Sequence, residues 1–181
     1  MCLTEAFIRG CVSDQELFNA IRDELRRRVP CGPYAPAAEY VERIQSLPPG
    51  LKAMAATYML DVSMALDDLL WYFWCAHCKR YCEEALSGLR ELEWNEAAEI
   101  FSEAYSLVLP HWDAIGAITD GGMFQDFCEE SGLEEAADPL NKRMWKVMGY
   151  WDKQEDDWFG LFGWWLRYAR KYPEKVVGSG T

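Results

Sequence analysis

Apolar residues recur every three to four positions along most of the chain, which is the spacing of one face of an α-helix. Ser13 and Glu16 form the capping-box pattern that marks a helix start, and the apolar positions that follow extend to residue 29. Proline or glycine interrupts most of the later stretches. The pattern predicts helices over residues 13–29, 36–47, 79–92, 95–109, 124–128, 133–148 and 154–172.

The most apolar stretch of the chain covers residues 51–75. Because it is apolar nearly all round, we expect it at the centre of the fold, as one long helix or as two with a bend near Asp61. It also contains Asp67 and Asp68, and an Asp at the centre of a bilayer costs roughly 2.5 to 3.5 kcal/mol. The stretch is therefore predicted to be a core helix and not a membrane span.

The predicted elements define the fold class. No stretch of useful length alternates apolar and polar residues as a strand does, and the 181 residues fit the size of one domain. We expect an all-α fold with a single domain over residues 1–181, a compact helical bundle of about seven to eight helices. The N-terminus lacks the basic and apolar regions of a secretory signal, so a cytoplasmic location is expected.

Charge narrows the choice of partners. The 30 Asp and Glu residues against 18 Lys and Arg give a net charge of −12, which repels nucleic acid and anionic membranes and favours basic proteins. The charge is also uneven along the chain. Between Glu83 and Asp138 there are 15 acidic residues and one base, Arg90, so this segment carries −14 while the remainder carries +2.

Within that segment the acidic residues form two groups. Glu96, Glu99 and Glu103 fall at helical spacing on one face, and they span about 10 Å at a rise of 1.5 Å per residue. This charge density approaches that of the phosphates along a DNA strand. The second group contains Asp126, Glu129, Glu130, Glu134, Glu135 and Asp138. Both groups are interpreted either as a binding surface for a basic protein or as a solvated face that only increases solubility.

The densest set of potential metal ligands is Cys75, His77, Cys78 and Cys82. Thiols and an imidazole this close together bind zinc in many proteins, so a zinc-binding or thiol-dependent protein is the alternative function. However, the three cysteines lie at helical spacing, and no other cysteines form a second close pair. We therefore expect them to be buried on one helix face and to hold no metal. The same face continues through Trp71, Leu86 and Leu89.

The sequence gives only weak evidence of catalytic residues. Asp61 and Asp68 are seven positions apart in an apolar segment, so that a shared helix face and acid–base chemistry are conceivable. Capping of backbone groups or pairing with an arginine is the better-supported role. The chain shows no nucleotide-binding loop or nucleophile-elbow motif, and we expect neither enzymatic activity nor a cofactor.

The final predicted helix is rich in aromatic residues. Its core stripe is predicted to contain Trp158, Leu161, Phe162, Trp165, Tyr168 and Tyr172. Trp164 lies off this stripe, and Gly160 and Gly163 would allow another backbone to approach closely. A hydrophobic docking site or a homodimer seam is one interpretation of this arrangement.

Residues 65–74, 83–92 and 95–101 together resemble the DNA-mimic protein domain family of bacteria. The resemblance covers about 50 residues. It implies a small acidic α-helical protein whose carboxylates imitate DNA phosphates toward a basic regulator. Together with the charge pattern, it leads us to expect a non-catalytic interaction protein that binds a basic partner, either a DNA-binding regulator or a toxin.

Overall fold

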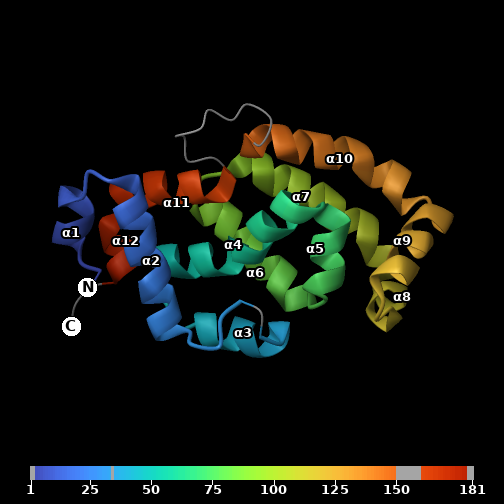
Figure 1. Ribbon diagram of the computed structural model, residues 1–181, viewed down its shortest axis with the longest axis horizontal. Coiled ribbons are helices and arrows are strands. Elements are labelled where there is room, and N and C mark those ends of the chain that lie inside the picture. The colour runs from blue at the N-terminus through green and yellow to red at the C-terminus, as the bar shows by residue number, and fades with distance from the viewer. Residues whose placement is uncertain (1–2, 34, 150–159, 179–181) are drawn as a thin grey trace.

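The computed structural model describes residues 3–33, 35–149 and 160–178, and these residues form helices and turns without a β-strand (Figure 1). The all-α class is confirmed. The helices are α1 (Glu5–Gly10), α2 (Asp14–Arg28), α3 (Ala37–Ile44), α4 (Pro49–Leu66), α5 (Leu69–Cys75), α6 (Lys79–Glu91), α7 (Asn95–Val108), α8 (Trp112–Ala117), α9 (Gly121–Glu130), α10 (Leu133–Met148), α11 (Gly160–Lys171) and α12 (Pro173–Val177). They outnumber the predicted seven to eight because the short helices α1, α8 and α12 leave little periodic signal and because the apolar stretch over residues 51–75 is divided between α4 and α5.

The apolar helix α4 occupies the centre of the fold, as predicted, with α6, α11, α12 and α5 packed around it. It ends at Leu66 rather than bending at Asp61. The side chain of Asp68 accepts a hydrogen bond from the Trp71 N–H at 2.8 Å and so begins α5 as a new helix. The break between α4 and α5 is therefore set by Asp68, the N-cap of α5.

Close approach of α4 and α6 depends on Gly88. A Cβ atom at this position would lie 3.0 Å from the carbonyl oxygen of Ala53 and 3.1 Å from Cγ2 of Thr57. Because real Cβ atoms are rarely this close to such neighbours, a larger side chain here would push α6 away from the central helix. This contact holds the middle of the bundle together.

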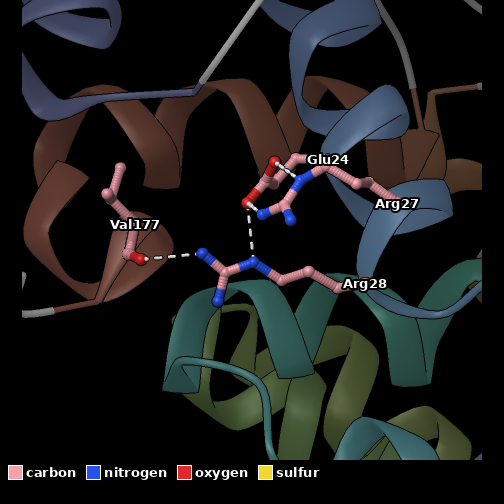
Figure 2. A network of polar contacts seen from close by, with 4 residues as sticks. All are labelled: Glu24, Arg27, Arg28 and Val177. Carbon is pink, nitrogen blue, oxygen red and sulfur yellow. Dashed lines mark hydrogen bonds and ion pairs between the residues drawn. The ribbon is translucent and has the colours of Figure 1, made fainter.

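The two ends of the chain are joined through a buried carboxylate on α2 (Figure 2). Arg27 donates two hydrogen bonds to Glu24, at 2.9 and 2.7 Å, and the Nε of Arg28 donates a third at 2.6 Å. The hydrogen bond from Arg27 is the main cause that lowers the pKa of Glu24, which is only 5% exposed. Arg28 also donates to the carbonyl of Val177, at 3.3 Å, and thereby ties α2 to α12.

The described members of the predicted aromatic stripe on α11 are buried in the core or packed against it. Leu161, Trp165 and Tyr168 are buried, and the indole N–H of Trp165 donates to the hydroxyl of Thr57 on α4 at 3.3 Å. Phe162 and Tyr172 are half-buried, and Trp158 lies outside the described residues.

Trp164 is packed within its own chain. Its ring stacks on that of buried Trp94, with 5.0 Å between ring centroids, and the guanidinium of Arg167 lies over the Trp164 ring, 5.0 Å from its centroid. Gly160 and Gly163 are buried as well. This region is therefore not an open apolar surface, and a homodimer seam here stays a prediction.

The helices that carry the second acidic group lie together at one end of the molecule. In Figure 1, α8 and α9 stand at the opposite end from α1, α2 and α12. Residues 112–138, which span α8, α9 and the start of α10, contain eight acidic residues and no Lys or Arg. Negative charge is thus concentrated at this end.

The described helices are all too short or too polar to cross a lipid bilayer.

Candidate functional site

The cysteine cluster does not form the predicted helix face. Helix α5 ends at Cys75 and α6 begins at Lys79, so the helical spacing does not continue from Cys75 to Cys82. Cys82 is buried and Cys78 is half-buried, but Cys75 is exposed, and its predicted burial is wrong. His77 lies in the intervening turn, where its Nε2 is 2.8 Å from the carbonyl oxygen of Trp112 and its ring stacks on that residue.

The thiol and zinc alternative gains no support from these positions. In the described part of the chain, no group of three or more His, Cys, Asp or Glu side chains is placed to hold a metal ion. Partial loss of solvent around the exposed Cys75 raises the pKa of its thiol, burial raises the pKa of Cys82, and burial raises the pKa of the Cys128 thiol to about 11. Since the thiolate is the form that attacks or ligates, these environments disfavour both roles.

Asp61 and Asp68 lie on different helices and do not form an acid–base pair. Buried Asp61 accepts a hydrogen bond from the N–H of Leu161 at 3.0 Å, close to the start of α11. Asp68 is the N-cap of α5. Their predicted common face is wrong because the helix breaks between them, whereas the predicted capping of backbone groups is confirmed.

The carboxylate stripe on α7 is present, but α10 places a cation on it. Glu96, Glu99 and Glu103 are all exposed. Arg143 donates to both carboxylate oxygens of Glu103, at 2.7 and 3.2 Å, and this contact lowers the pKa of Glu103. The hydrogen bond to Glu103, followed by the charges of all three carboxylates, raises the pKa of Arg143. The stripe is therefore partly neutralised.

A smaller share of the carboxylates in the second acidic group is paired with a cation. Glu129 and Glu130 end α9, and Glu134 and Glu135 begin α10 on the other side of a turn through Gly132. These four carboxylates are exposed, and within the described residues none forms an ion pair. Of the six acidic residues in this group, Asp138 is paired, with Lys142 at 2.6 Å.

Two hollows open beside these carboxylates, where the start of α5 meets α9 and α10. Their volumes are about 350 and 520 Å³, and both are lined by Asp68, Glu129 and Glu134. We call the smaller one the acidic hollow. Its carboxylate walls are Asp67, Asp68, Asp126, Glu129 and Glu134, and its aromatic walls are Trp71 and Phe124.

Asn141 on α10 holds Asp68 at the edge of the hollow. The Asn141 side chain is only 5% exposed; its oxygen accepts from the N–H of Leu69 at 3.1 Å and its nitrogen donates to Asp68 at 3.2 Å. Burial raises the pKa of Asp68 and also that of Asp67. The sequence pattern did not include either residue in the predicted binding surface, because both lie outside the segment in which the acidic residues are concentrated.

The aromatic wall depends on close packing at the start of α9. The rings of Trp74 and Phe124 stack with 5.0 Å between centroids, and Trp71 meets Trp74 edge-on at 4.7 Å. A Cβ atom at Gly121 would lie 3.4 Å from the ring of Trp71. The start of α9 therefore packs at ordinary van der Waals distance from the aromatic cluster.

Comparison with known proteins places this acidic end inside the region that a family model matches. The model of the family described as DMP19-like protein matches residues 45–165, about two thirds of the chain. The chain belongs to the DMP19-like protein family. The match confirms the resemblance to the DNA-mimic family and extends well beyond the roughly 50 residues that suggested it. Curated proteins and solved structures give no significant match to this chain.

The DMP19-like region includes every wall of the acidic hollow, from Asp67 to Glu134. It also includes a placement of charge that works against local stability. Glu129 and Glu130 lie at the C-terminal end of α9, whose last turn contains no basic residue. Because the helix dipole is negative at that end, carboxylates there are unfavourable.

Proposed function

We propose that this DMP19-like chain is a non-catalytic protein that binds a DNA-binding protein by imitating the charge of DNA. Membership of the family indicates a protein of the DNA-mimic type. The proposal adds the surface: the carboxylates at the α9–α10 end, grouped around the acidic hollow, meet the basic residues with which the partner contacts phosphates.

The observation that carries this proposal is the set of exposed carboxylates that have no ion partner within the described residues. Glu129, Glu130, Glu134 and Glu135 lie at one end of the molecule, next to Asp67 and Asp68 in the hollow wall. A surface of one sign accelerates association with an oppositely charged surface, especially at low ionic strength. Contacts between phosphates and Lys or Arg side chains dominate protein–DNA affinity. A DNA-binding protein therefore carries a positive surface that matches these carboxylates.

Two finer points belong to this proposal. The partner is a DNA-binding regulator rather than a toxin, because the family favours mimicry of DNA over neutralisation of an unrelated basic protein. The complex forms in the cytoplasm of a bacterium, where such regulators encounter DNA.

The test is a capture experiment with the immobilised full chain. Host lysate is applied at low salt, bound proteins are eluted with rising salt, and duplex DNA is added as a competitor in a parallel run. The variant replaces Glu129, Glu130, Glu134 and Glu135 by Gln. The control neutralises four exposed carboxylates elsewhere, Glu16, Asp23, Glu42 and Glu174, and changes the net charge equally.

We expect a DNA-binding protein to be retained by the wild type and the control, released by DNA, and lost with the variant. Retention of a basic protein that DNA does not displace would favour the toxin interpretation. Equal retention by all three proteins would show that the acidic end only increases solubility.

A further inference from the structure

An apolar groove lies on the other side of Trp71 from the acidic hollow. It has a volume of about 320 Å³ and runs between α4, α5 and the segment before α3. We call it the Leu66 groove. Its main walls are Met59, Val62, Leu66, Trp71, Cys75 and Tyr81. Because Trp71 lines both cavities, the apolar groove and the acidic hollow share a wall.

Two side chains of the groove bear on what it can bind. Leu66, at the end of α4, is 79% exposed to solvent. Tyr81 is almost fully buried, yet its hydroxyl has no hydrogen-bond partner within the described residues. A single exposed Leu is common on protein surfaces, but Leu66 lies at the rim of an apolar cavity, where a second apolar side chain can be buried against it. The Tyr81 hydroxyl has almost no accessible surface, so an incoming group does not reach it.

The two cavities also influence each other electrostatically. Asp67, in the wall of the acidic hollow, raises the pKa of Cys75 in the groove, after the larger effect of burial. Because Trp71 lines both cavities, a molecule that fills one of them lies beside the other. Adjacent cavities suit neighbouring side chains of a single segment better than two separate ligands.

We propose that the acidic hollow and the Leu66 groove form one composite site, which binds one amphipathic cationic segment of the basic partner. This inference rests on the proposed function. An Arg or Lys side chain enters the acidic hollow, and an adjacent apolar side chain covers Leu66. A guanidinium pairs with carboxylates and also stacks on aromatic rings, so it suits a cavity with Asp67, Trp71 and Phe124 in its walls.

Charge determines the choice of occupant. A second copy of this chain, with a net charge of −12, would bring like charge to the hollow, and an anionic membrane would be repelled in the same way. A purely apolar ligand would fill the groove and leave the carboxylates without a partner. A cationic amphipathic segment places a positive charge in the acidic hollow and an apolar side chain in the Leu66 groove.

The experiment uses a fluorescent, blocked helical peptide that carries Arg residues along one face and a Leu beside them. Its affinity for the full chain is measured by anisotropy at several salt concentrations. Leu66→Ser changes a side chain that is 79% exposed, and the matched control Val12→Ser changes one that is 94% exposed near α1. Because both residues are exposed, neither substitution should disturb folding.

We expect Leu66→Ser to weaken peptide binding roughly tenfold, the scale for covering one Leu side chain, without changing its salt dependence. Val12→Ser should bind as the wild type does. A peptide whose Leu is replaced by Ser should no longer distinguish wild type from Leu66→Ser. Bound peptide should also slow alkylation of Cys75, followed by mass spectrometry.

The outcomes separate this inference from the proposed function. If neutralising Glu129, Glu130, Glu134 and Glu135 weakens binding while Leu66→Ser behaves like Val12→Ser, the acidic surface stands and the composite site is wrong. Unchanged alkylation of Cys75 at saturating peptide overturns the composite site as well. If the wild type does not bind the peptide, or if none of the variants affects its binding, the composite site is wrong, whereas the proposed function is decided separately by the capture experiment.

Discussion

Arg143 on α10 donates hydrogen bonds to both carboxylate oxygens of Glu103 on α7, at 2.7 and 3.2 Å. This contact changes which acidic surface is available to a partner. Along the sequence, Glu96, Glu99 and Glu103 form the most regular row of negative charge, yet in the fold a guanidinium lies among them. The carboxylates at the ends of α9 and α10, together with Asp67 and Asp68, are the better candidates for binding.

The first prediction concerns this pair. Because Arg143 lowers the pKa of Glu103, the contact stabilises the folded state above the unfolded pKa of Glu103, and that stabilisation is lost as the pH falls through the folded pKa. Arg143→Gln should return the pKa of Glu103 toward its ordinary value, measured by NMR titration of the carboxyl carbon. Both side chains are exposed, so the free energy of unfolding should hardly change. An unaltered pKa would show that the pair does not persist in solution.

The second prediction concerns the charges at the end of α9. Glu129→Gln and Glu130→Gln should each stabilise the protein by about 0.3 to 1 kcal/mol at low ionic strength, because they remove negative charge from the negative end of a helix dipole. The melting temperature should rise, and the gain should shrink with added salt.

Glu134→Gln is the matched control for this effect. Glu134 lies in the first turn of α10, where a carboxylate is favourable, so its loss should not stabilise the protein. Equal effects at the two helix ends would mean that general charge repulsion, rather than the dipole, sets the stability of this region.

The third prediction concerns the aromatic core. Trp165 is fully buried, and Trp165→Ala should cost about 3 to 5 kcal/mol of unfolding free energy, measured with urea. Trp164→Ala should cost less, because Trp164 is half-buried, although it loses the stack on Trp94. A larger loss at Trp164 than at Trp165 would mean that the orientation of α11 is wrong.

The fourth prediction concerns pH. Burial raises the pKa of Asp67 and of Asp68 in the free protein, whereas a bound cation favours their charged forms. Binding of the cation should therefore favour deprotonation of these carboxyls, and the affinity for the captured DNA-binding protein should fall as the pH is lowered toward their raised pKa values. Asp67→Asn should make this decline shallower than it is in the wild type. The exposed Asp113 lies outside the hollow, and Asp113→Asn should leave the decline unchanged.

Local sequence patterns predicted those features that depend on neighbouring residues. The cap of α2 is an example: the N–H of Glu16 donates to the Ser13 hydroxyl at 3.2 Å. The central position of α4 follows in the same way from its apolar composition. The sequence also located the acidic segment, because net charge can be counted without knowledge of the fold.

Features that depend on distant residues could not be predicted in this way. Arg143 meets Glu103 across 40 positions, and Asn141 meets Asp68 across 73. Nothing in the local pattern of α7 or α5 indicates either partner. The exposure of Cys75 was missed for another reason: helical spacing was extended through residues 76–78, where the helix ends. The acidic hollow depends on long-range contacts of this kind and emerged only from the structure.

The most direct test of the central claim is the salt dependence of binding to the DNA-binding protein captured from lysate. Its dissociation constant is measured at increasing salt for the wild type, for the variant with Gln at residues 129, 130, 134 and 135, and for the control with equal charge loss elsewhere. We predict weaker binding and a shallower salt dependence for the variant alone, with the control close to the wild type. Identical affinities and salt dependences for all three proteins would contradict the account.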